Sequence, residues 1–123
     1  MPSMPATEVI LKRFDKPDEV RDFPKGTFEL VNIGGMTIGR ATYQPGWRWS
    51  VDVGPGLGLK LCSVEHLGLV LEGAATVSFE DGRVWELTPG TLFHVPPEPH
   101  DSAVVGDALY VSLHFLGASH YAK

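Results

Sequence analysis

The chain has 123 residues, with 10 lysines and arginines against 15 aspartates and glutamates, a formal net charge of −5, and a single cysteine. This length suits one domain with a substantial core, and the negative charge excludes the basic face that nucleic acids need. No run of about 20 apolar residues is present to span a membrane. We therefore expect a cytoplasmic protein without a nucleic-acid or membrane partner, and Cys62 can form no intrachain disulfide.

The first predicted element is a short helix over Pro17–Phe23. Pro17 suits the first helical position, and Gly26 follows the end of the segment. Residues 1–26 are thus expected to form an N-terminal arm that carries this helix.

The rest of the chain is predicted to be β-structure. The 14 glycines and 10 prolines are spread along the sequence and separate runs of strand length that are rich in β-branched and aromatic residues. These runs are Thr27–Ile33, Met36–Gln44, Leu59–Cys62, Leu67–Leu71, Ala74–Glu80, Arg83–Leu87, Thr91–Val95, Ala103–Val105 and Ala108–Leu116. Regular reversals between them predict an antiparallel sandwich or barrel over residues 27–117, followed by a tail over residues 118–123.

Two connections carry specific expectations. Asp81-Gly82 predicts a hairpin with a two-residue loop between Ala74–Glu80 and Arg83–Leu87. The glycine-rich stretch Val51–Gly58 is expected to be a mobile loop over one end of the barrel, beneath which a substrate enters.

The segment Leu67–Leu71 is apolar on both strand faces, whereas a sheet with one wet face alternates. A second layer must therefore cover its outer side. A partner subunit, or the segment Val9–Phe14 of this or another copy, can supply that layer, and this predicts a homodimer.

Among the residues able to carry chemistry, Cys62 and His66 stand four positions apart. On a straight strand they would lie roughly 13 Å apart, too far to share one metal ion. They can meet only if the chain turns at Ser63–Glu65, because the surrounding glycines disfavour a helix.

The sequence resembles the cupins, a family of small jelly-roll barrels. The residues that carry the likeness are Cys62-x-x-x-His66-x-Gly68-x-Val70-Leu71-x-Gly73, then Asp81-Gly82, Pro89-Gly90, Val95-Pro96-Pro97 and His100-Asp101, within roughly Tyr43 to Gly117. In the first family motif, His66 falls on the glutamate position and Cys62 on the second histidine. Lys60 replaces the first histidine, and in the second motif Glu98 stands at the glycine position and His100 comes one residue early.

The resemblance implies an all-β fold with a single jelly-roll barrel and a metal ion held inside it by residues of both motifs. Transferred to this chain, those ligands are Cys62, His66 and His100, while Lys60 cannot serve when charged. One thiolate and two imidazoles suit zinc or ferrous iron, with nickel or copper as further choices, and leave a coordination position open.

Trp49, His94 and His114 are candidate substrate-binding residues, since they lie in segments expected to line the barrel. Each also has an ordinary structural interpretation. The histidines can face solvent or satisfy buried hydrogen bonds, and the tryptophan can serve as core or dimer packing.

The leading hypothesis is a metal-dependent enzyme acting on a small molecule inside the barrel, as a dioxygenase, isomerase or lyase. The alternatives are a module that binds or senses a small ligand without turnover, and a structural dimer whose barrel is merely filled. The fold by itself does not choose among these classes.

Overall fold

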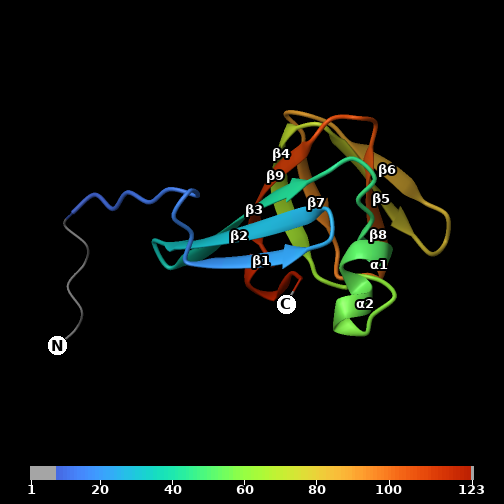
Figure 1. Cartoon of the computed structure of the whole chain (residues 1–123), viewed down its shortest axis with the longest axis horizontal. Helices are drawn as coiled ribbons and strands as arrows, with labels where there is room; N and C mark the ends of the chain where they lie inside the picture. The colour runs from blue at the N-terminus through green and yellow to red at the C-terminus, as the bar shows by residue number, and fades with distance from the viewer. Residues whose placement is uncertain (1–7, 123) are drawn as a thin grey trace.

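The computed structural model describes residues 8–122, so the first seven residues of the arm and Lys123 lie outside it. The described chain forms two antiparallel sheets and two short helices (Figure 1). The strands are β1 Glu19–Phe23, β2 Gly26–Ile33, β3 Met36–Tyr43, β4 His66–Glu72, β5 Ala74–Phe79, β6 Val84–Leu87, β7 Leu92–Val95, β8 His100–Val105 and β9 Tyr110–Leu116. No helix within these residues is long and apolar enough to cross a membrane.

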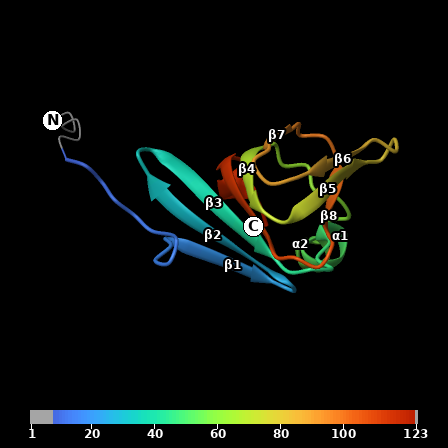
Figure 2. The ribbon, with the colours of Figure 1, turned by 90° about the horizontal axis from the view of Figure 1, so that it is seen from above.

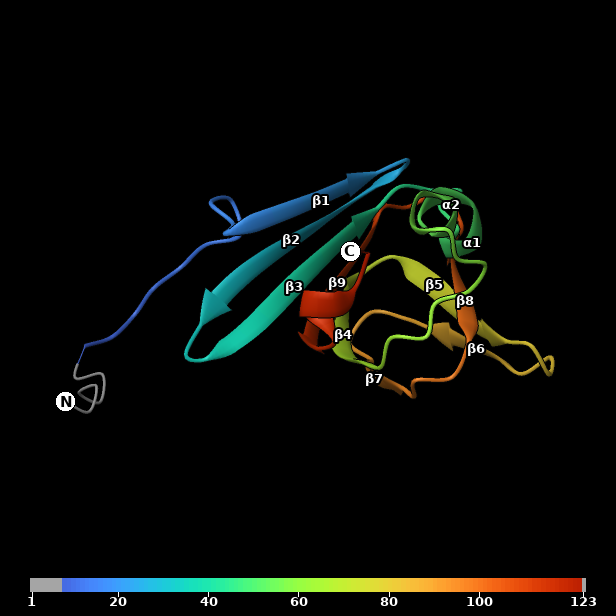
Figure 3. The ribbon, with the colours of Figure 1, turned by 90° about the horizontal axis from the view of Figure 1, so that it is seen from below.

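A six-stranded sheet in the order β1-β2-β3-β9-β4-β7 curves around a three-stranded sheet in the order β6-β5-β8 (Figures 2 and 3). Successive side chains of a strand point to opposite faces of the sheet, and burial alternates accordingly. On β5, Ala75, Val77 and Phe79 are buried, while the residues between them are half-buried. The inner faces of the two sheets enclose the core. The predicted all-β jelly-roll fold is therefore confirmed.

The predicted N-terminal helix is wrong, because Glu19–Phe23 is the edge strand β1. It pairs with β2 from Glu19 opposite Leu30 to Phe23 opposite Gly26. An isolated two-turn helix is marginal in water, whereas this segment gains a full ladder of backbone hydrogen bonds beside β2.

The glycine-rich stretch is also more regular than expected. Trp49–Asp52 forms helix α1 and Gly54–Leu57 forms helix α2. Asp101 at the start of β8 fixes α1, since its carboxylate accepts hydrogen bonds from the backbone N–H of Ser50 at 2.9 Å and from the Ser50 hydroxyl at 2.7 Å. A side chain distant in sequence thus orders a segment whose own composition favours a loop.

The β5–β6 hairpin exists, but its loop has three residues. Ser78 pairs with Val84, and the N–H of Phe79 donates to the carbonyl of Arg83. The loop is therefore 80–82, with Gly82 at φ 93° closing it in the left-handed region. A type I turn followed by a left-handed residue is the usual three-residue hairpin, and it replaces the predicted two-residue loop.

The C-terminal segment folds back onto the barrel. Gly117, at φ 82°, reverses the chain after β9, and Ala118–His120 forms a single 3₁₀ turn, η1. A Cβ atom on Gly117 would lie 2.0 Å from the Glu65 carbonyl oxygen, so only glycine fits there. The reversal carries the side chain of Tyr121 into the core, where it is 4% exposed.

Candidate metal centre and cavity

Cys62, His66 and His100 converge at one end of the barrel interior. One ligand atom from each lies within 4.8 Å of the other two, and all three residues are buried. The Sγ atom of Cys62 is 3.7 Å from Nε2 of His66. The structure thus brings together the three residues to which the resemblance assigned a metal ion.

The local backbone explains this convergence. Cys62 forms an isolated antiparallel bridge with His100, in which each N–H donates to the carbonyl of the other at 2.9 Å. The chain then runs without regular structure through Ser63–Glu65, and His66 opens β4. The side chains of Cys62 and His66 therefore meet across an irregular connection.

A backbone carbonyl orients His100. Its Nδ1 lies 2.8 Å from the Glu98 carbonyl oxygen, which can only accept, so Nδ1 carries the proton. The lone pair is then on Nε2, the state required of a metal-binding imidazole. The stiff Pro-Pro-Glu-Pro approach to His100 fixes this arrangement.

Burial controls the protonation of the cluster. It raises the pKa of the Cys62 thiol to about 11. It also lowers the pKa of His66 well below its usual value, with help from the neighbouring His114 and His100, and lowers the pKa of His100. Both imidazoles are therefore neutral near pH 7 and available as ligands.

The donor set fits a divalent transition metal. Nitrogen and sulfur atoms bound to one tetrahedral ion stand about 3.4–3.6 Å apart, so the Cys62–His66 spacing already suits an ion and the wider spacings need only small side-chain adjustments. Lys60, which takes the place of the first family histidine, is exposed. The three residues can thus hold a metal ion and leave one position open.

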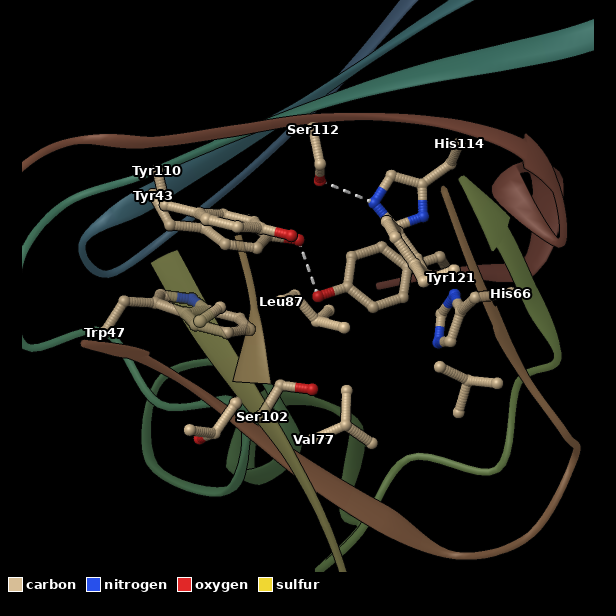
Figure 4. Close-up of a pocket in the computed structure, with 14 residues that line it drawn as sticks. Tyr43, Trp47, His66, Val77, Leu87, Ser102, Tyr110, Ser112, His114 and Tyr121 are labelled. Carbon is tan, nitrogen blue, oxygen red and sulfur yellow. Dashed lines mark hydrogen bonds between the residues drawn. The ribbon is translucent and has the colours of Figure 1, made fainter. Parts of the chain in front are cut away.

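A small cavity lies beside this cluster, with His66 in its wall (Figure 4). Its volume is about 40 Å³, room for about three water molecules. Aromatic, aliphatic and hydroxyl side chains line it, and none of the lining residues is acidic, lysine or arginine. They are Tyr43, Trp47, His66, Ala75, Thr76, Val77, Leu87, Phe93, Val95, Ser102, Tyr110, Ser112, His114 and Tyr121.

Two hydrogen-bonded pairs lie next to each other in the cavity wall (Figure 4). The Tyr43 hydroxyl donates to the Tyr121 hydroxyl at 2.7 Å, and the Ser112 Oγ lies 3.1 Å from Nε2 of His114. Within the described chain, Nδ1 of His66 and Nδ1 of His114 are buried without a hydrogen-bond partner. Unpaired buried polar atoms in a cavity wall are groups that a bound ligand or water would satisfy.

Of the three candidate substrate-binding residues, the structure places only His114 at this cavity. Trp49 is buried at the start of α1 and packs beside Gly54. His94 points outward from β7, where its Nε2 lies 2.8 Å from a Glu65 carboxylate oxygen. Residues 51–58 do not line the cavity either.

The sequence interpretation missed Tyr43, Trp47 and Tyr121. Strand alternation contained a signal for Tyr43, since Ala41 and Tyr43 share the buried face of β3. Trp47 precedes helix α1 and lies outside every strand, so strand alternation gave no signal for it. Tyr121 gave no signal, because its position depends on the reversal at Gly117.

No protein-family model matches the chain, and no curated protein matches it at a significant level. Solved structures do. The polyketide cyclase RemF from Streptomyces resistomycificus aligns with a TM-score of 0.62 at 16% identity, over 90% of this chain and 80% of that one. Ectoine synthase from P. lautus aligns with a TM-score of 0.62 at 12% identity, over 90% and 82%.

A cupin 2 domain-containing protein from Halorhodospira halophila aligns with a TM-score of 0.56 at 18% identity, over 76% of this chain and 64% of that one. Identities this low show the fold alone. Together with the two antiparallel sheets and the spacing of glycines and prolines, they establish that this chain has the small barrel fold of the cupin superfamily.

Proposed function

We propose that the chain is a metal-dependent enzyme that holds one divalent transition metal ion on Cys62, His66 and His100 and acts on a small molecule in the barrel. The observation that supports this most is the approach of three buried ligand atoms from separate segments to within 4.8 Å. Buried imidazoles with no carboxylate partner are costly unless something uses them. Zinc and ferrous iron are the ions that suit this donor set best.

A metal ion bound there would act as a Lewis acid and lower the pKa of a bound water. The protein's own residues shape the site around that chemistry. The apolar wall of Val77, Leu87 and Phe93 excludes bulk water, which strengthens electrostatic interactions inside. The hydroxyls of Tyr43 and Tyr121 and the free Nδ1 of His114 supply hydrogen bonds that orient a polar ligand.

The reaction class is an isomerisation, a lyase or cyclisation step, or a dioxygenation. Among the proteins of similar fold are a polyketide cyclase, an ectoine synthase and a sugar phosphate isomerase. The absence of any carboxylate from the described cavity wall favours chemistry in which a metal ion, and not an acid–base pair of side chains, supplies the activation.

Elemental analysis tests the metal site directly. Protein purified without added metal is expected to hold close to one equivalent of a transition metal, and His66→Ala and His100→Ala are expected to lose it. His94→Ala is the matched control, because it removes an exposed histidine outside the cluster. Less than about a tenth of an equivalent in the wild type, unchanged by His66→Ala, overturns the proposal.

A second candidate is a binding or sensing module that uses the same cavity without turnover. The small volume of the cavity favours this alternative. Oxygen uptake, hydrolysis and isomerisation assays on a panel of small acids and diketones separate the two. Saturable binding with no product across the panel would favour the sensor.

A further inference from the structure

One side of the cavity wall is formed by Tyr121, near the C-terminal end of the chain. The Tyr121 ring lies among groups from three strands, with its centroid 4.7 Å from that of Phe28, 5.3 Å from His66 and 5.8 Å from His114. Figure 4 shows this ring between His66 and the tyrosines of the opposite wall. Tyr121 therefore occupies space that would otherwise belong to the cavity.

Only one layer of chain separates the cavity from solvent here. Ser119 and His120 are exposed, while Ala118 and Tyr121 on either side of them are buried. The backbone hydrogen bonds that His120 and Tyr121 donate go to Gly117 and Ala118, within the same segment. Among the described residues, the segment thus forms no sheet ladder with the barrel that it covers.

One side chain from the other end of the protein holds the segment in place. The Arg21 guanidinium on β1 donates to the carbonyl oxygens of Ala118 at 3.2 Å, Ser119 at 3.1 Å and Tyr121 at 2.5 Å. Its Nε also pairs with Glu19 at 2.6 Å, and the side chain is only 10% exposed. Charge-assisted bonds to three carbonyls of this one turn hold the segment firmly.

We infer that Tyr121 limits the size of molecule that reaches the cavity, and that Arg21 is the positioning residue that holds it there. The inference rests on the proposed function, since it concerns access to the same site. With Tyr121 in place, the space of about 40 Å³ admits only a molecule of a few heavy atoms. A larger substrate that enters past Tyr121 needs residues 117–122 to move outward, and this breaks the Arg21 bonds and the Tyr43–Tyr121 hydroxyl bond.

The reactivity of Cys62 in metal-free protein measures this access without requiring a metal. Cys62 is the one thiol of the chain and is 2% exposed. Its Sγ lies 3.7 Å from Nε2 of His66, and the His66 ring in turn lies 5.3 Å from the Tyr121 ring. The rates of alkylation by small iodoacetamide and of disulfide exchange with bulky Ellman's reagent are compared. Each rate is divided by the rate of the same reagent with free cysteine. The ratio of the two normalised rates then reports how strongly the protein excludes the larger reagent.

The wild type is expected to favour the small reagent by about tenfold or more, because local opening is rarely wide enough for the large one. Tyr121→Ala and Arg21→Ala are expected to bring the ratio to within about threefold, and Arg21→Lys to restore part of it. Arg40→Ala is the matched control, since it removes another arginine of the same sheet that pairs with a carboxylate, Glu29.

A core variant separates a gate from simple destabilisation. Val70→Ala removes a buried side chain that does not line the cavity, and it increases global opening, which raises the rates of both reagents together. If Tyr121→Ala and Arg21→Ala change the ratio no more than Val70→Ala does, the inference is overturned. The two reagents react with metal-free protein, so this experiment can be interpreted even if the chain binds no metal ion.

Discussion

The Sγ atom of Cys62 lies 3.7 Å from Nε2 of His66, although four positions of extended chain would separate the two residues by roughly 13 Å. The bridge between Cys62 and His100 and the irregular segment Ser63–Glu65 produce this contact. The proposed metal site thus depends on a bridge between two backbone segments that no sequence motif marks.

The protonation of the cluster predicts a proton count for metal binding. In metal-free protein near pH 7, burial keeps the Cys62 thiol protonated, with a pKa of about 11, and keeps His66 and His100 neutral by lowering their pKa values. Zinc binding is therefore expected to release about one proton per ion, from the thiol. Calorimetry in buffers of different ionisation enthalpy measures it, and Cys62→Ala removes the release. A wild-type release of none would show that the thiol does not bind the ion.

Acid is expected to destabilise the metal-free protein through its buried histidines. Burial lowers the pKa of His114 to about 4, while an unfolded histidine titrates near its model value of 6.5. The unfolded state therefore takes up the proton first as the pH falls. The contribution of His114 is intact above pH 6.5 and is lost between pH 6.5 and about 4, up to about 3 kcal/mol.

Urea unfolding of metal-free protein at a series of pH values tests this expectation. His114→Phe is expected to reduce the decline in the free energy of unfolding between pH 6.5 and 4, leaving the part due to His66 and His100. An unchanged slope in His114→Phe contradicts the assignment.

The two buried tyrosine hydroxyls are expected to be energetically coupled. Tyr43→Phe or Tyr121→Phe leaves the remaining hydroxyl without its partner, which costs about 1–3 kcal/mol. The double variant removes both groups and is expected to be less destabilised than the sum of the singles, by about 1 kcal/mol or more. Chemical denaturation of the wild type, the two single variants and the double variant gives the free energies of unfolding for this double-mutant cycle. Losses in the single variants that add up to the loss in the double variant would argue against a direct bond.

We propose that the outer face of β4 meets a second copy of the chain. Leu67 and Leu71 point outward there and are 41% and 43% exposed, and the neighbouring Leu92 on β7 is 71% exposed. Residues 8–11, among them the exposed Val9 and Leu11, extend away from the two sheets and do not cover this face (Figure 1). An apolar face of this kind is typical of an interface.

Light scattering at micromolar concentration is expected to show a homodimer that the double variant Leu67→Lys/Leu71→Lys converts to a folded monomer. Val84→Lys, at an exposed apolar position on β6, is the matched control and is expected to stay dimeric. A monomeric wild type would remove the proposal.

The sequence by itself determined the class of fold and the three candidate metal ligands. Strand-length runs separated by glycine and proline are local signals, and the positions of Cys62, His66 and His100 relative to Gly73 and Gly90 carry the resemblance. Local propensity failed where a distant group decides the conformation. β1 is a strand because β2 lies beside it, and α1 is ordered because Asp101 holds Ser50.

Tertiary structure alone decided what surrounds the site. His94 and His114 both lie in strands, yet one faces Glu65 at the surface and the other faces the cavity, since the side on which a strand residue points depends on which face of its sheet is covered. Tyr121 reaches the interior only because Gly117 reverses the chain and Arg21 binds the carbonyls beyond it. Contacts between residues almost a whole chain apart are fixed by packing, and no local pattern encodes them.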